Sequence, residues 1–242
     1  MIKACVFDVG NTLVNDAESM GIALQDLAIW LKRKGIFEDE RVLVDVYKGF
    51  NRRLHCPHWS HTFGELELFE GTLKALRIKN FEPSEALSRY RQILEERTKP
   101  DPDVTETLRF LRERGIKVAL LTDERSERIK MFIRRTKIRS LIDATIISEE
   151  VGVEKPHPLM FREVKRKLGV EFPEMIMFGD NEATDGAGKR LGMKFVLVKA
   201  YKDPKWNWSQ GPTCSPDYVI EKITRQNVEK CLETLKASEN SG

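Results

Sequence analysis

Residues 3–13 read KACVFDVGNTL, an apolar run that ends in one carboxylate, Asp8, and a turn of small and polar residues. A continuous apolar run is typical of a buried parallel strand, and open α/β sheets bind their ligands at the carboxyl ends of such strands. Gly10 and Asn11 tolerate the backbone angles of a tight turn, which would direct main-chain N–H groups around Asp8. The pattern therefore predicts an anion-binding loop, although an Asp8 that only caps a turn would produce the same local sequence.

The remainder of the chain shows two kinds of periodicity. From residue 17 to residue 99, apolar positions recur near the 3.6-residue period of a helix, and no segment alternates like a strand. Beyond residue 103, helical patterns alternate with short apolar runs, which is typical of βαβ units and of a parallel sheet with helices on both faces. We therefore predict an α/β core formed by residues 1–15 and 100–242, interrupted by an all-α domain at residues 16–99.

The periodicity also predicts individual elements. Helices are expected at residues 17–34, 41–50, 63–76 and 83–97 in the insert, and at 104–115, 126–136, 158–168, 186–191 and 225–235 in the core. Strands are expected at 117–121, 144–147, 175–178, 194–198 and 217–220, beside the first strand. The Pro-rich residues 99–103 read as a hinge, and we expect the insert to close over Asp8 as a lid.

Composition excludes several classes of function. The 242 residues include 41 Lys and Arg against 38 Asp and Glu, a net charge of +3, which gives no reason to expect a nucleic-acid or membrane-surface partner. No apolar run approaches the roughly 20 residues of a membrane span, and the chain begins on the first strand rather than on a signal peptide. We expect a cytoplasmic protein that binds a small molecule. Its oligomeric state is not predicted.

Polar side chains follow several of the predicted strands. Thr122 and Asp123 come after the second strand, Lys155 follows the third, and Asp180 follows the fourth with Asp185 five residues on. Each alone could be a helix cap or a surface residue. Because the carboxyl ends of parallel strands meet at one edge of a sheet, their joint occurrence with Asp8 favours a common site.

This order of residues resembles the four motifs of the haloacid dehalogenase superfamily, with Asp8 in motif I, Thr122 in motif II, Lys155 in motif III, and Asp180 through Asp185 in motif IV. The resemblance covers essentially the whole chain, because that family places a C1-type helical cap between motifs I and II. It implies a Rossmann-like, doubly wound core and a Mg²⁺-dependent phosphatase that acts on a small phosphorylated metabolite.

The resemblance also implies roles for individual residues. Asp8 is the expected nucleophile, which forms an aspartyl-phosphate, and Thr122 and Lys155 are expected to donate to the phosphoryl oxygens. The implied Mg²⁺ ligands are Asp8, the Gly10 carbonyl, Asp180 and, through water, Asp185. Substrate contacts are expected from Asn11, Thr12, Thr122, the backbone N–H of Asp123, and Lys155. The cation is needed because a carboxylate must approach an anionic phosphoryl group.

Gly10 departs from the family pattern. Phosphatases of the family usually carry a second Asp two residues after the nucleophile, where it protonates the leaving group and later activates water. General acid–base help of this kind contributes typically about 10² to 10⁴ in rate. A glycine therefore predicts a slow phosphatase, a substrate with a good leaving group such as an acyl phosphate, or a base from elsewhere, for which Asp16, Glu18 or another cap residue are candidates.

Three other functions stay open. A 2-haloacid dehalogenase would also lack the second Asp and would use Asp8 against carbon without a metal, but it typically lacks the acid at Asp180. A phosphonate hydrolase would need an imine-forming lysine in the cap, for which Lys32, Lys34 and Lys48 carry no distinguishing feature. A non-catalytic module that binds a phosphometabolite or a protein would have lost turnover with the missing Asp while keeping Asp8, Thr122, Lys155 and Asp180.

Two further clusters stand out in the sequence. His55, Cys56, His58 and His61 could suggest zinc, but Pro57 and the lack of a second ligand pair favour a loop at the substrate entrance, from which a His could also supply the missing acid or base. Trp206 and Trp208 are expected to cover an edge of the core rather than to stack on nucleobases. The four cysteines, Cys5, Cys56, Cys214 and Cys231, have no paired spacing, so reduced thiols are expected.

Overall fold

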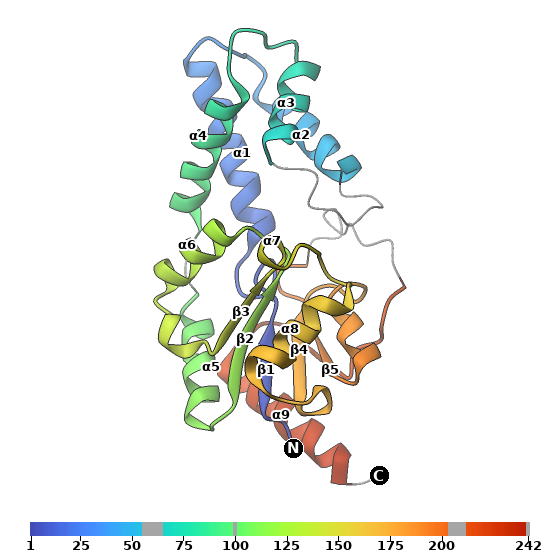
Figure 1. Ribbon diagram of the computed structural model, residues 1–242. Helices are drawn as coiled ribbons and strands as arrows, with labels where there is room; N and C mark the ends of the chain where they lie inside the picture. The colour runs from blue at the N-terminus through green and yellow to red at the C-terminus, as the bar shows by residue number, and fades with distance from the viewer. Residues whose placement is uncertain (55–64, 99–100, 203–211, 241–242) are drawn as a thin grey trace. The chain divides into compact units, whose positions relative to one another are not determined.

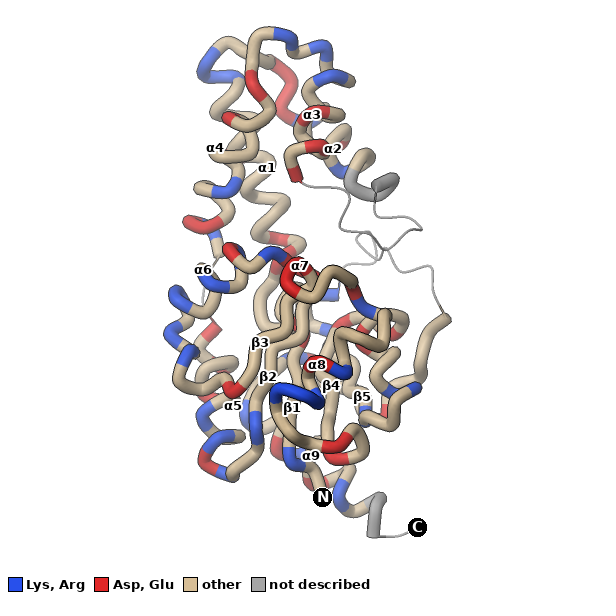
Figure 2. The backbone as a smooth tube through the Cα atoms, in the orientation of Figure 1, with Lys and Arg blue, Asp and Glu red and all other residues tan. Residues whose placement is uncertain are grey.

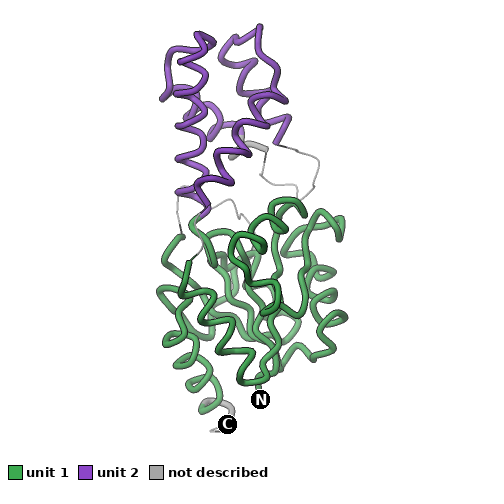
Figure 3. Tube along the Cα trace, turned by 90° about the vertical axis from the view of Figure 1, so that its left-hand side faces the viewer, with its two compact units in different colours: residues 1–15, 100–242 green, residues 16–99 purple. Residues whose placement is uncertain are grey.

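The computed structural model describes residues 1–54, 65–98, 101–202 and 212–240. The chain forms two compact units, Met1–Asn15 with Pro100–Gly242 and Asp16–Lys99, coloured green and purple in Figure 3. The histidine-rich segment 55–61, Trp206 and Trp208 lie outside the described residues, as do residues 99 and 100 of the expected hinge.

The first unit is built on a parallel sheet (Figure 1). Its strands lie in the order β3-β2-β1-β4-β5-β6, and every pair of neighbours is parallel. The bounds are β1 Ala4–Phe7, β2 Lys117–Thr122, β3 Ala144–Ile147, β4 Met175–Gly179, β5 Lys194–Val198 and β6 Tyr218–Ile220. This architecture confirms the predicted α/β class with a doubly wound sheet.

Alternate residues of the central strands enter two separate hydrophobic cores. On β1, Cys5 and Phe7 face a core shared with α5 (Pro102–Glu113), α6 (Ser126–Thr136) and α9 (Arg225–Asn240). Ala4 and Val6 face the other core, which α8 (Pro158–Leu168) covers (Figure 1). Because both faces of the sheet are covered, the central strand β1 is buried and apolar along its whole length, as its sequence predicts.

Two short segments of this unit differ from the predicted elements. Residues 186–191 form a 3₁₀ helix, η3 (Gly186–Leu191), where an α-helix is expected. Its glycines permit a close approach, because a Cβ on Gly188 would lie 2.9 Å from the sulfur of Met193. A helix not expected, α7 (Ser148–Val151), follows β3 and stops at Gly152, whose φ is 84°. It is too short to show a helical period. Two further 3₁₀ turns are η1 (Arg139–Leu141) and η2 (Phe172–Glu174).

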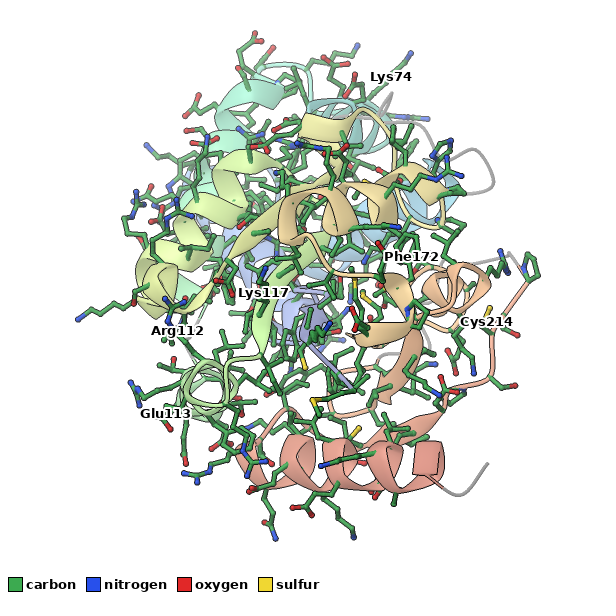
Figure 4. All side chains as sticks on the ribbon, turned by 60° about the horizontal axis from the view of Figure 1, so that its bottom comes forward. Lys74, Arg112, Glu113, Lys117, Phe172 and Cys214 are labelled. Carbon is green, nitrogen blue, oxygen red and sulfur yellow. The ribbon has the colours of Figure 1, made fainter. Side chains whose placement is uncertain are left out.

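Local signals explain where other helices begin and end. Asp101 caps α5, because its side chain accepts a hydrogen bond from Asp103 N over 3.0 Å. Gly169, in the left-handed region, ends α8. Lys117, labelled in Figure 4, begins β2 and donates to the carbonyl of Leu168 over 2.6 Å, which joins this strand to the last turn of α8.

The second unit is helical, as its period predicts. It contains α1 (Asp16–Arg33), α2 (Glu40–Leu54), α3 (Glu65–Ala75) and α4 (Pro83–Arg97). The centre of this unit is aromatic, since the ring of Phe69 lies 5.1 Å from that of Tyr47 and 5.4 Å from that of Tyr90. Pro83 occupies the first turn of α4, where its missing N–H costs no hydrogen bond.

The described residues carry charges of both signs and three free thiols. Basic and acidic positions are interspersed along most elements (Figure 2). Cys5, Cys214 and Cys231 are free thiols, and Cys214 is labelled in Figure 4. Within the described ranges, no helix has the length and apolar character needed to cross a membrane.

The stacked rings of Phe7 and Phe178 provide a test of the central sheet. Their centroids lie 4.9 Å apart at an interplanar angle of 14°, and both side chains are fully buried. Replacing Phe178 by Ala leaves a cavity between β1 and β4, which should lower the free energy of unfolding by about 3–5 kcal/mol in urea denaturation. Val219→Ala, at a side chain 42% exposed on β6, should change it by no more than about 0.5 kcal/mol. Equal losses in both variants would contradict this description of the core.

Candidate active site

Asp8 lies at the carboxyl end of the central strand. β1 pairs with β2 on one side and with β4 on the other, and Asp8 N donates to Phe178 O over 2.9 Å. Thr122 closes β2 and is buried, whereas Asp180 follows directly after β4. The parallel sheet therefore brings together residues that are more than one hundred positions apart in the chain.

The turn after Asp8 folds back on Val9. The carbonyl of Val9 accepts from the N–H groups of Thr12 (3.3 Å), Leu13 (2.9 Å) and Val14 (3.3 Å), and Asn11 takes the left-handed φ of 54° that a turn of this kind requires. Gly10 pairs with Val14 in an isolated bridge. The turn is therefore tight, as predicted.

Thr12 makes two hydrogen bonds inside the turn. Its N–H is directed at Val9, and its hydroxyl donates to Oδ2 of Asp8 over 3.1 Å. Both donors of Thr12 are thus engaged inside the turn. This geometry suits a residue that orients the Asp8 carboxylate better than one that binds a substrate directly.

Lys155 is a buried cation between two carboxylates. Its Nζ lies 2.7 Å from Oδ1 of Asp8 and 2.6 Å from Oδ1 of Asp185, and the residue is 2% exposed. Burial alone would lower the pKa of Lys155, but the charges of Asp185, Asp8 and Asp123 raise it well above its ordinary value. Lys155 therefore carries a permanent positive charge beside Asp8.

Three carboxylates converge around this charge. Asp8, Asp180 and Asp185 each offer an oxygen within 4.8 Å of the others. Burial, followed by the charges of Asp185 and Asp8, raises the pKa of Asp180 well above its ordinary value. Burial likewise raises the pKa of Asp185 to about 6, with Asp8 adding to this effect and Lys155 opposing it. One ammonium group does not balance three carboxylates, so a further cation would stabilise the cluster.

The donor set fits Mg²⁺. This ion prefers oxygen ligands at about 2.0–2.1 Å, so two ligands on opposite sides of it are about 4 Å apart. The ligand oxygens of the three carboxylates lie within 4.8 Å of one another, so small side-chain movements would bring them to that spacing.

Gly179 makes the position of Asp185 possible. A Cβ on Gly179 would lie 2.2 Å from Oδ2 and 2.3 Å from Cγ of Asp185, which no side chain tolerates. The same Oδ2 accepts from Asn181 N over 3.1 Å, while Oδ1 accepts from Lys155. The glycine before Asp180 thus leaves room for the second carboxylate of the loop.

The side chain of Asp123 makes a contact that the sequence did not reveal. Its Oδ1 accepts a hydrogen bond from the backbone N–H of Lys155 over 2.8 Å. Burial raises the pKa of Asp123 to about 8 against the opposing charge and hydrogen bond of Lys155, and Glu154 and Asp8 add to the rise. Only the backbone of Asp123 was expected to take part, because no pattern in the sequence shows which loop a side chain will meet.

The candidate replacements for the missing acid lie in the second unit. Asp16 and Glu18 belong to the first turn of α1. Of the lysines considered for imine chemistry, Lys32 pairs with Glu40 over 3.1 Å, and the Nζ of Lys34 lies 5.7 Å from the ring centre of Trp30. These contacts suit solvated surface lysines at the end of α1.

Comparison with known proteins places the chain in a family. The family model described as haloacid dehalogenase-like hydrolase matches residues 2–192. Glyceraldehyde 3-phosphate phosphatase of Methanopyrus kandleri is 35% identical over 127 residues, 51% of this chain and 53% of that protein, so the chain spans about half the length of this relative. (S)-2-haloacid dehalogenase 4A of Burkholderia cepacia is 25% identical over 84% of this chain and 85% of its own.

A solved structure shows the same fold. The HAD hydrolase YfnB of Bacillus subtilis aligns with a TM-score of 0.74 over 96% of this chain and 99% of its own, at 18% identity. At that identity, the likeness concerns the fold alone. The family match covers both the strand that ends at Asp8 and the loops that carry Thr122, Lys155 and Asp180. This chain belongs to the haloacid dehalogenase-like hydrolases.

Proposed function

We propose that this protein is a Mg²⁺-dependent phosphatase that hydrolyses a small phosphorylated metabolite through an aspartyl-phosphate on Asp8. The observation that carries the proposal is the convergence of Asp8, Asp180 and Asp185 around the ammonium group of Lys155. A nucleophilic carboxylate, a fixed cation and a set of oxygen ligands are the parts that phosphoryl transfer requires.

The residues divide the reaction into two steps. A carboxylate oxygen of Asp8 attacks phosphorus as the bond from phosphorus to the leaving oxygen breaks, and water then attacks the aspartyl-phosphate to release phosphate and restore Asp8. Thr12 and Lys155 each hold one oxygen of Asp8, which fixes the plane of the carboxylate. Thr122 and Lys155 donate to the phosphoryl oxygens. A Mg²⁺ held by Asp8, Asp180, Asp185 and the Gly10 carbonyl would offset the repulsion between the two anions.

Gly10 shapes the choice of substrate. It has no side chain to protonate the leaving oxygen, so substrates whose leaving group departs without a proton, such as acyl phosphates and activated aryl phosphates, should react best. The relative from Methanopyrus kandleri, by its name, acts on a sugar phosphate, which has a poorer leaving group. Asn11 and the Asp123 backbone N–H would complete the substrate contacts.

A 2-haloacid dehalogenase is the second candidate, because the Burkholderia cepacia relative carries that name and matches most of both chains. Against it stands the acidic cluster, since attack on carbon needs no metal and gains nothing from two further carboxylates beside Asp8. The binding module without turnover is the third candidate. It accounts for Gly10, but it gives no reason for the 2.7 Å contact between Lys155 Nζ and Asp8 Oδ1.

Replacing Asp8 by Asn tests the nucleophile. The variant should lose Mg²⁺-dependent hydrolysis of p-nitrophenyl phosphate and acetyl phosphate, because the amide cannot form the covalent intermediate. Phosphate release with and without Mg²⁺ measures the loss. Undiminished turnover would show that Asp8 is not the nucleophile. Metal-independent release of chloride from 2-chloropropionate by the wild type would establish the dehalogenase instead.

A panel of phosphorylated metabolites tests the binding module. The wild type should release phosphate above the enzyme-free rate from at least one compound, and EDTA should suppress that release. Calorimetric binding of a panel member without any release, in the presence of Mg²⁺, would favour the module over the phosphatase.

Replacing Gly10 by Asp tests the missing acid. The new carboxyl group should raise kcat/KM for an alkyl phosphate by up to about 10²-fold and leave kcat/KM for p-nitrophenyl phosphate nearly unchanged, because kcat/KM reports the first step, in which only the alkoxide needs a proton. Gly10→Asn is the matched control, of similar size and without an acid. Equal effects of the Asp and Asn variants on both substrates would contradict the assigned function of this position.

Replacing Gly179 by Ala tests the metal site. The added methyl group must displace the carboxylate of Asp185, so the dissociation constant for Mg²⁺ should rise at least about tenfold by calorimetry. Gly21→Ala is the control, because a Cβ at that position in α1 meets no atom within 4 Å. Circular dichroism verifies that both variants fold. An unchanged Mg²⁺ affinity in Gly179→Ala would remove Asp185 from the ligand set.

A further inference from the structure

The segment that follows Thr122 and the segment that leads to Lys155 are joined by several hydrogen bonds. Ser126 N donates to Glu149 Oε2 over 2.9 Å, and the Ser126 hydroxyl donates to Glu150 Oε1 over 2.8 Å. Ser148 Oγ also donates to Glu124 O over 3.3 Å. The segment after β2 is therefore attached along its length to α7, which follows β3.

A further hydrogen bond joins the same two segments next to Thr122. Asp123 is the neighbour of Thr122 in the chain, and its Oδ1 accepts the main-chain N–H of Lys155 itself, over 2.8 Å. The loop between α7 and α8 also holds a local turn in which His157 N donates to Glu154 O, but that bond does not reach the sheet. Asp123 is thus the described side chain that connects the Lys155 backbone to the end of β2.

This connection matters because a lysine side chain is long. Its ammonium group sits at the end of four rotatable bonds, so the place where the charge acts depends on where the main chain is held. The Lys155 ammonium must meet Asp8 at 2.7 Å and Asp185 at 2.6 Å. A displacement of about 1 Å in a catalytic group can cost about 10²-fold in rate.

We propose that Asp123 is a positioning residue. Its side chain accepts the hydrogen bond from the Lys155 N–H and so holds the Lys155 ammonium group in place beside Asp8 and Thr122. The inference rests on the proposed function for its catalytic purpose, but the geometry that it describes is testable separately. It assigns to the carboxyl group of Asp123 a role distinct from that of its backbone N–H.

The experiment compares Asp123→Ala, Asp123→Asn and Ser126→Ala in the full chain. The Ala variant removes the acceptor, whereas Asn keeps both the shape and an oxygen that can accept. Ser126→Ala removes the hydroxyl bond to Glu150 and leaves the Lys155 N–H bonded, so it controls for general loosening of the loops. Circular dichroism and thermal unfolding establish that each variant folds.

The first measurement is amide hydrogen exchange of Lys155 by NMR. We expect the Lys155 amide to exchange at least about tenfold faster in Asp123→Ala than in the wild type, because a buried hydrogen bond is lost. Asp123→Asn and Ser126→Ala should remain within about threefold of the wild type. Unchanged exchange in Asp123→Ala would overturn the inference whether or not the protein is a phosphatase.

The second measurement separates kcat from KM for acetyl phosphate with Mg²⁺. Asp123→Ala should lower kcat by about 10- to 100-fold with less than about a threefold change in KM, and Asp123→Asn should restore most of kcat. The positioning role is overturned if kcat is retained in Asp123→Ala, if Asn fails to rescue it, or if Ser126→Ala loses as much. A wild type without any phosphate release would refute the proposed function, and the exchange data would still decide whether Asp123 holds the lysine loop.

Discussion

The site depends on one buried ion cluster, in which the ammonium group of Lys155 lies between Asp8 and Asp185. A charge this far from water is tolerated only when partners surround it, and removing one partner leaves the others without compensation. Three carboxylates share one ammonium group, and their oxygens lie close enough together to hold a metal ion.

The parallel sheet is what makes such a cluster possible. β1 is flanked on both sides by parallel strands, so the chain leaves β1, β2 and β4 at the same edge. Each strand end contributes a polar group at nearly the same height, and the covering helices keep the rest of the sheet apolar. Gly179 then removes the one Cβ that would push Asp185 out of the cluster. Fold and site are therefore linked through the ends of three strands.

Sequence reasoning succeeded where a residue's position follows from its own strand. The family, the α/β class and the placement of Asp8, Thr122 and Asp180 at strand ends could be predicted, because an apolar run followed by a polar residue has few other interpretations in a parallel sheet. It failed for short or glycine-rich segments. α7 is too brief to show a period, and the glycines of η3 favour a tighter turn than the expected α-helix. The hydroxyl of Thr12 donates to Asp8, because the geometry of the turn, and not the residue type, sets the direction of that hydroxyl.

The sequence by itself determined which chemical groups are present, including the nucleophilic carboxylate, the lysine and the glycine that stands where an acid is usual. It also determined their order along the chain, because hydrophobic periodicity is a local property. Only the tertiary structure decided which of these groups meet. The contact between Asp123 and the Lys155 N–H, and the approach of Asp185 to Gly179, each join segments whose separation in space depends on how whole strands and loops pack. Residue types specify which groups are able to bond, and packing specifies which of these groups come into contact.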